Sequence, residues 1–156
     1  MSQGDPRAPE ALPYIDRHSV VVGAAPHLVW GSLVHALERA SGRRARAVVR
    51  LLGADPAAPG GRLPEVGATV PGFAVVTTAP GSRLELAGRH RFSQYGLVIT
   101  LTAKPDGRTL LAAHTHARFP GLHGRAYRAL VIGSRGHRVL VRRMLRSIAK
   151  AAEKQH

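Results

Sequence analysis

Apolar side chains recur along the chain with two periods, and each change of period marks a predicted element. Polar and β-branched residues alternate over residues 17–22, which predicts a first strand that ends at Gly23. After Pro26 the period is helical, since four large apolar residues fall on one face at i, i+3, i+4 and i+7: Trp30, Leu33, Val34 and Leu37. The same spacing over residues 45–52 predicts a second, shorter helix.

Residues 55–72 are rich in Pro and Gly, which predicts a loop with one short strand near residues 68–70. Four strand patterns then follow at hairpin spacing, over residues 73–78, 83–92, 95–103 and 109–119. Turn residues separate them: Pro80-Gly81, Ser93-Gln94 and Pro105-Asp106-Gly107. Because such short connections join antiparallel neighbours, we expect an antiparallel sheet.

The last long segment, residues 122–153, returns to helical spacing. Its predicted inner stripe comprises Ala126, Leu130, Gly133, His137, Leu140, Val141, Met144, Leu145 and Ile148. We expect one continuous helix of roughly 45 Å, with Arg and Lys on its other face. Gly133, Ser134 and Gly136 would then lie mid-helix, where each Gly costs about 1 kcal/mol relative to Ala. Two features would compensate: close packing on the sheet, or room for a ligand.

Composition narrows the class of protein. The 156 residues have a hydrophobic fraction of 44% and suit one globular domain, which we place at residues 14–153 after a flexible tail of residues 1–13. There is no Cys, which excludes disulfides and thiolate sites. The chain has no apolar run of the ~20 residues that span a bilayer and no signal-like start, so we expect a cytoplasmic protein, either monomer or homodimer.

Three stretches resemble the SRPBCC superfamily, and in particular a bacterial, mostly actinobacterial, branch of it. They are SVVVGAAPHLVWGSL (residues 19–33), GRHRFSQYGLVITLT (88–102) and ARFPGLHGRAYRALVIGSRGH (117–137). That superfamily includes START-like lipid carriers, polyketide cyclases and dehydratases, and plant pathogenesis-related proteins. The resemblance covers residues 14–153 and implies an α+β helix-grip fold. In this fold a curved antiparallel sheet wraps around a long C-terminal helix, with two short helices after the first strand and a cavity inside.

A cavity in that position would be lined by the inner faces of the strands and the helix. The residues we expect to bind a small, mostly apolar molecule are Leu86, His90, Phe92, Leu97, Ile99, Tyr127, Leu130, Gly133, His137 and Val141. Arg125 and Arg128 would suit an acidic group at the rim. A carrier of such a molecule is the first hypothesis. The second is a cyclase- or dehydratase-type enzyme with His90 or His137 as general base, although both imidazoles also suit plain structural hydrogen bonds.

The formal charge of +14 and the isoelectric point near 11.7 add a third hypothesis. The Arg face of the terminal helix would bind nucleic acid or an anionic membrane electrostatically. Against it, aromatic residues make up only 4% of the chain and no nucleic-acid recognition motif is present. An Arg-rich composition also arises from GC-rich coding, with no partner implied.

Other chemistry finds little support in the sequence. His114 and His116 share a strand face as two zinc ligands would, but further ligands are not evident, so we expect no metal. No nucleophile elbow, P-loop or dinucleotide fingerprint is present, and we expect no cofactor.

Overall fold

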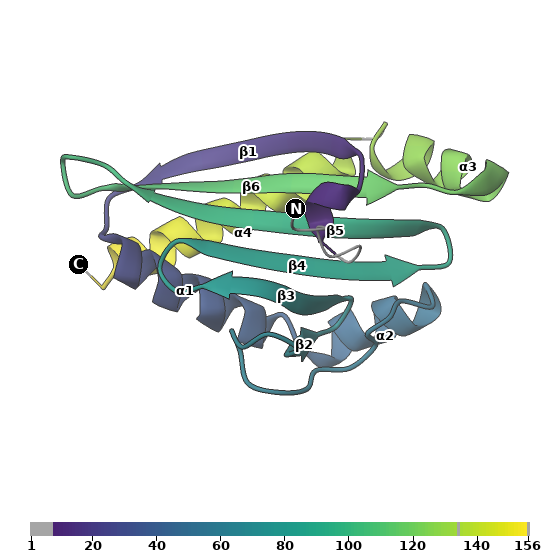
Figure 1. The fold of residues 1–156 in the computed structure, drawn as a ribbon, viewed down its shortest axis with the longest axis horizontal. Coiled ribbons are helices and arrows are strands. Elements are labelled where there is room, and N and C mark those ends of the chain that lie inside the picture. Colours follow the sequence, from purple (N-terminus) through teal and green to yellow (C-terminus); the bar gives the residue numbers. More distant parts are fainter. Residues whose placement is uncertain (1–7, 134, 156) are drawn as a thin grey trace, which may run out of the picture.

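One antiparallel sheet of six strands forms the body of the molecule in a computed structural model that describes residues 8–133 and 135–155 (Figure 1). The strand order is β1-β6-β5-β4-β3-β2, so the first strand closes onto the last. The bounds are β1 (Tyr14–Val22), β2 (Thr69–Val70), β3 (Phe73–Ala79), β4 (Arg83–His90), β5 (Ser93–Ala103) and β6 (Thr109–Arg118). The predicted antiparallel sheet is confirmed.

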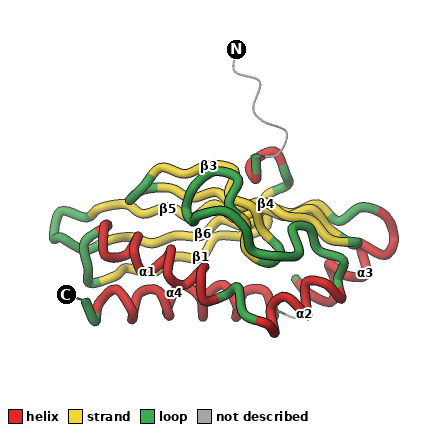
Figure 2. The backbone as a smooth tube through the Cα atoms, turned by 90° about the horizontal axis from the view of Figure 1, so that it is seen from below, coloured by secondary structure: helices red, strands yellow, loops and turns green. Residues whose placement is uncertain are grey.

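The four α-helices form a second layer on one face of the sheet, which we call the inner face (Figure 2). They are α1 (Pro26–Arg39), α2 (Arg43–Leu51), α3 (Gly121–Val131) and α4 (Gly136–Glu153). α4 packs against β1 and α1. α2 and α3 lie at the end of the molecule where β4 turns into β5, on the right of Figure 1. This arrangement is the α+β helix-grip fold that the sequence predicts.

The prediction of a single helix over residues 122–153 is wrong, because the helix is interrupted between α3 and α4. Arg135 has a left-handed backbone with φ of 62°, which no helix interior tolerates. A Cβ at Gly133 would collide with the carbonyl of Ala129, so only glycine fits there. Ser134 lies outside the described residues. The small residues therefore separate two helices, and the sequence period did not reveal this because it continues on both sides.

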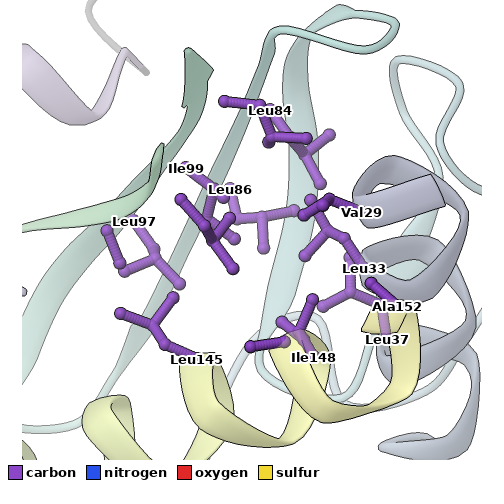
Figure 3. Close-up of a cluster of buried hydrophobic side chains, with 14 of the residues drawn as sticks. Val29, Leu33, Leu37, Leu84, Leu86, Leu97, Ile99, Leu145, Ile148 and Ala152 are labelled. Atoms are coloured by element: carbon purple, nitrogen blue, oxygen red, sulfur yellow. The ribbon is translucent and has the colours of Figure 1, made fainter. Parts of the chain in front are cut away.

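Aliphatic side chains fill the space between the sheet, α1 and α4 (Figure 3). Those from the strands include Leu84, Leu86, Leu97 and Ile99, while the helices contribute Val29, Leu33, Leu37, Leu145, Ile148 and Ala152. They come from positions with strand or helix period, as expected for packed inner faces. This packed region is the core of the molecule.

The outer face of the sheet carries part of the segment that we expected to be a loose tail. Pro9–Ala11 form a short 3-10 helix, and Pro9 is buried directly on Gly96, which has no side chain to keep it away. Arg83 ties this segment down through ion pairs to Glu10 at 2.8 Å and to Glu85 at 2.6 Å. Residues 1–7 of the expected tail lie outside the described residues.

Candidate functional site

The residues that we expected to line one cavity fall into separate environments. Leu86, Leu97, Ile99 and Val141 belong to the packed core, where each contacts other aliphatic side chains. Their period placed them correctly on the inner face. Period alone, however, does not say whether an inner face lines a hollow or a packed core.

A second group gathers at the end of the sheet beneath α3. We call His90, Phe92, Tyr95, Phe119 and Tyr127 the aromatic cluster. The ring centroids of Tyr127 lie 4.8 Å from His90, 5.4 Å from Phe92 and 6.4 Å from Phe119, and His90 lies 5.4 Å from Tyr95. The structure thus brings together three predicted site residues, His90, Phe92 and Tyr127, from β4, the β4–β5 turn and α3.

The turn between β4 and β5 sets the geometry of this cluster. It comprises Arg91 and Phe92, not Ser93-Gln94 as expected, so His90 and Ser93 are paired directly across the two strands. Residues opposite each other in an antiparallel pair share a face, which puts the side chains of His90, Ser93 and Tyr95 all on the inner face. Sequence reasoning missed Ser93 as a cluster neighbour because it assigned that residue to the turn.

Both ring nitrogens of His90 have hydrogen-bond partners. The backbone N–H of Phe92 donates to Nδ1 at 3.1 Å, and Nε2 lies 3.2 Å from Oγ of Ser93. Because Nδ1 accepts a hydrogen bond, its lone pair is free of a proton and the neutral ring carries its proton on Nε2. Burial lowers the pKa of His90 and so favours this neutral form. In this geometry Nε2 donates to Ser93, and His90 has no basic nitrogen left to serve as a general base.

Tyr95 is held just as firmly. Its hydroxyl donates to the carbonyl of Gly72 at 2.8 Å, and burial raises its pKa to about 12. The ring lies over Gly88, where a Cβ would collide with both Gly72 and Tyr95. Gly88 therefore makes room for the aromatic ring beside it.

The second histidine candidate, His137, lies in a different place, between α4 and β1. Its Nε2 is 3.1 Å from Oγ1 of Thr115 and 3.6 Å from Oδ1 of Asp16. The other carboxylate oxygen of Asp16 is 3.2 Å from Nε2 of His18, which in turn accepts from Arg142 through Nδ1 at 3.4 Å. Asp16 was missed in the sequence because the predicted strand began at residue 17, three residues after the start of β1 at Tyr14. The two histidine candidates do not share a site.

The remaining predicted residues lie on the outside of α3. Leu130 is 70% exposed and does not face the sheet, contrary to expectation, because the break after α3 gives each helix its own phase. Gly133, Arg125 and Arg128 border a surface hollow of about 390 Å³, together with Ala129 and Ile132. The two guanidinium groups that we expected at the rim of a site thus border one hollow on α3, the helix that also carries Tyr127 of the aromatic cluster.

The positive charge of the chain gathers on the helix layer. A hollow of about 600 Å³ on α4 is bordered by Val139, Arg142, Arg143, Arg146, Ser147 and Lys150. α2 carries Arg43, Arg44, Arg46 and Arg50 and buries none of its residues. No helix in residues 8–133 and 135–155 is both long enough and apolar enough to span a membrane.

His114 and His116 lie on the outer face, where the sequence analysis weighed a metal site. Nδ1 of His116 is 3.2 Å from the carbonyl of Leu12, and its ring contacts Tyr14. Within the part of the chain that the structure describes, no group of three or more His, Cys, Asp or Glu side chains is placed to hold a metal ion.

Solved structures with a similar fold include a protein from Nitrosospira multiformis, with a TM-score of 0.57 and 15% identity over 88% of this chain and 94% of that chain. A protein from Chromobacterium violaceum has a TM-score of 0.52 and 16% identity over 90% of this chain and 99% of that chain. Ara h 8.0201 has a TM-score of 0.50 and 9% identity over 88% of this chain and 95% of that chain. No family model and no curated protein matches the chain.

At these identities the likenesses show the fold alone. The chain is a helix-grip protein, as the resemblance to the SRPBCC superfamily implies. Membership of that superfamily stays a prediction.

Proposed function

We propose that the protein binds a small, mostly apolar molecule at the aromatic cluster beneath α3. The observation that carries this proposal is the gathering of five rings at one end of the sheet, from β4, the β4–β5 turn, β5, the segment after β6, and α3. Sites for small molecules are lined mainly by aromatic and aliphatic groups with a few polar groups among them, and this cluster has that composition.

The proposed site lies under α3 because the cover there is thin. α3 buries only Gly124, whereas α4 buries Val141, Leu145, Ile148, Ala149 and Ala152. Regions with few buried apolar contacts open at low free energy. A ligand that displaces α3 outward therefore replaces ring contacts without disturbing the packed core.

An acidic group on the ligand would be favoured by Arg125 and Arg128. Both are exposed on α3, and both border the hollow of about 390 Å³ on its flank. A carboxylate forms charge-assisted hydrogen bonds with guanidinium groups, which are stronger than those between neutral groups.

The test is a binding titration with fatty acids, sterols and aromatic polyketides, followed by backbone NMR. We expect shifts in residues 88–95 and 121–131 and a loss of affinity of about tenfold or more in Tyr127→Ala. Tyr14→Ala is the matched control, since Tyr14 is an exposed tyrosine on the outer face. Absence of binding by every compound, or equal affinity of Tyr127→Ala and wild type, would overturn the proposal.

A second candidate function is electrostatic binding of phosphate-rich polyanions by the helix layer. The observation that favours it is the hollow on α4, which is bordered by four cations and no acidic residue. Binding to duplex DNA and to vesicles of anionic phospholipid should weaken steeply between about 50 mM and 500 mM salt. For DNA, replacing Arg143 and Arg146 by Gln should lower the salt slope by about 2, while Arg62→Gln in a distant loop should not. Salt-independent binding would contradict this function.

A further inference from the structure

We infer that the hydroxyl of Ser93 donates a hydrogen bond to an acceptor oxygen of the bound molecule, so that the site selects flat apolar molecules with a carbonyl-type oxygen. This inference rests on the proposed function and adds the chemical class of the ligand. It follows from the direction of the hydrogen bonds around His90.

The first step is the proton on His90. The backbone N–H of Phe92 can act only as a donor, so Nδ1 of His90, at 3.1 Å, is the acceptor of this hydrogen bond. Neutral His90 therefore carries its proton on Nε2, and the contact of 3.2 Å to Ser93 runs from Nε2–H to Oγ. Ser93 is the acceptor in this pair.

The second step is the hydroxyl proton of Ser93, which this pair leaves without an acceptor. Ser93 is only 3% exposed. Among residues 8–133 and 135–155, the only side-chain hydrogen bond of Ser93 is the one with His90. Buried polar groups in folded proteins nearly always find a partner, so a buried O–H donor beside the aromatic cluster favours an acceptor on the ligand.

The third step concerns the hydrogen bonds of the two tyrosine hydroxyls in the cluster, those of Tyr95 and Tyr127. The Tyr95 hydroxyl already donates to the carbonyl of Gly72. The described residues provide no hydrogen-bond partner for the Tyr127 hydroxyl, which lies at the half-buried edge of the cluster. The hydroxyls of Ser93 and Tyr127 are thus two unengaged donors, which a ketone, lactone or carboxyl oxygen on the ligand would satisfy and a plain hydrocarbon would not.

A pair of probes that differ in one group tests the inference: 9-fluorenone, a flat tricyclic ketone, and fluorene, which has a methylene in place of the carbonyl. We expect wild type to bind fluorenone about tenfold more tightly than fluorene. Ser93→Ala should bind both equally, Ser93→Thr should restore the preference, and Ser19→Ala on the exposed outer face should leave it unchanged. The infrared carbonyl stretch of bound fluorenone should move to lower frequency in wild type and return toward its free value in Ser93→Ala.

The outcomes separate this inference from the proposed function. Equal affinity of wild type for both probes, with both weakened by Tyr127→Ala, would leave the aromatic site standing and overturn the role of Ser93. Failure of both probes to bind would overturn this inference, which names flat apolar molecules as the ligand class, while the titration with fatty acids, sterols and polyketides decides the proposed function separately. If Ser93→Ala fails to fold, the infrared frequency in Ser93→Thr decides, since a stretch at the free value there rules out the hydroxyl contact. A fluorenone complex whose crystal structure places only an ordered water on Ser93 would also contradict the inference.

Discussion

The two ends of the inner face differ in chemistry although the same strands build both. Toward α1 and α4, β4 and β5 present Leu84, Leu86 and Ile99 to a layer of aliphatic helix residues that closes over them. Toward α3, the same two strands present His90 and Tyr95, and the covering helix buries a single glycine. The first end has the density of a core that stabilises the fold. The second has polar groups and a thin cover, and these features support the proposed site.

Shortening one side chain at each end of the inner face should produce the largest difference between the two ends. Ile148→Ala leaves a cavity in the packed core and should lower the free energy of unfolding by about 2–5 kcal/mol. Leu130→Ala on exposed α3 should change it by less than about 0.5 kcal/mol. Urea denaturation measures both. Similar losses in the two variants would show that α3 is as tightly packed as α4.

Glycine substitutions test the same comparison, with a smaller expected change in the free energy of unfolding. Gly88→Ala forces a methyl group into Gly72 and Tyr95 and should destabilise the protein by about 1–3 kcal/mol. Gly31→Ala in α1 is the matched control, because nothing lies within 4 Å of the added Cβ. A helix gains stability from that change, by about 0.5–1 kcal/mol. Tolerance of Gly88→Ala would mean that Tyr95 is not held as described.

The smallest expected effect is a dependence of the free energy of unfolding on pH that arises from His90 in the aromatic cluster. Burial lowers the pKa of folded His90 below its ordinary value of 6.5, so the unfolded chain binds the proton first as pH falls. Stability should therefore be complete above about pH 6.5 and decline from there toward the folded pKa. His90→Gln should remove part of this decline in urea titrations between about pH 8 and 5.

His114 serves as the comparison on the outer face. Burial and the nearby Arg17 lower its pKa as well, so a decline of the same sign should remain in His90→Gln and become smaller again in the double variant with His114→Gln. A profile in which His90→Gln alone leaves the decline untouched would show that His90 titrates as it does in the unfolded chain.

Much of the fold could be predicted from single residues and their spacing. The alternation around Leu97 and Ile99 and the helical spacing of Leu33 and Leu37 both placed those side chains on the inner face, where they are. Such patterns are local consequences of backbone geometry, so they are readable from the chain. The predicted site was harder: His90, Phe92 and Tyr127 do meet, but His137 and Leu130 lie elsewhere.

The sequence by itself determined the order of the elements, the inner faces of the strands and helices, and the excess of positive charge, because each depends on neighbours within a few residues. Tertiary structure alone decided three things: that the terminal segment breaks at Arg135, that the space under α4 is filled, and that Ser93 lies against His90. Each depends on groups far apart in the chain or on the exact position of one turn. A shift of two residues in that turn changes which side chains meet across the hairpin, and no local pattern records it.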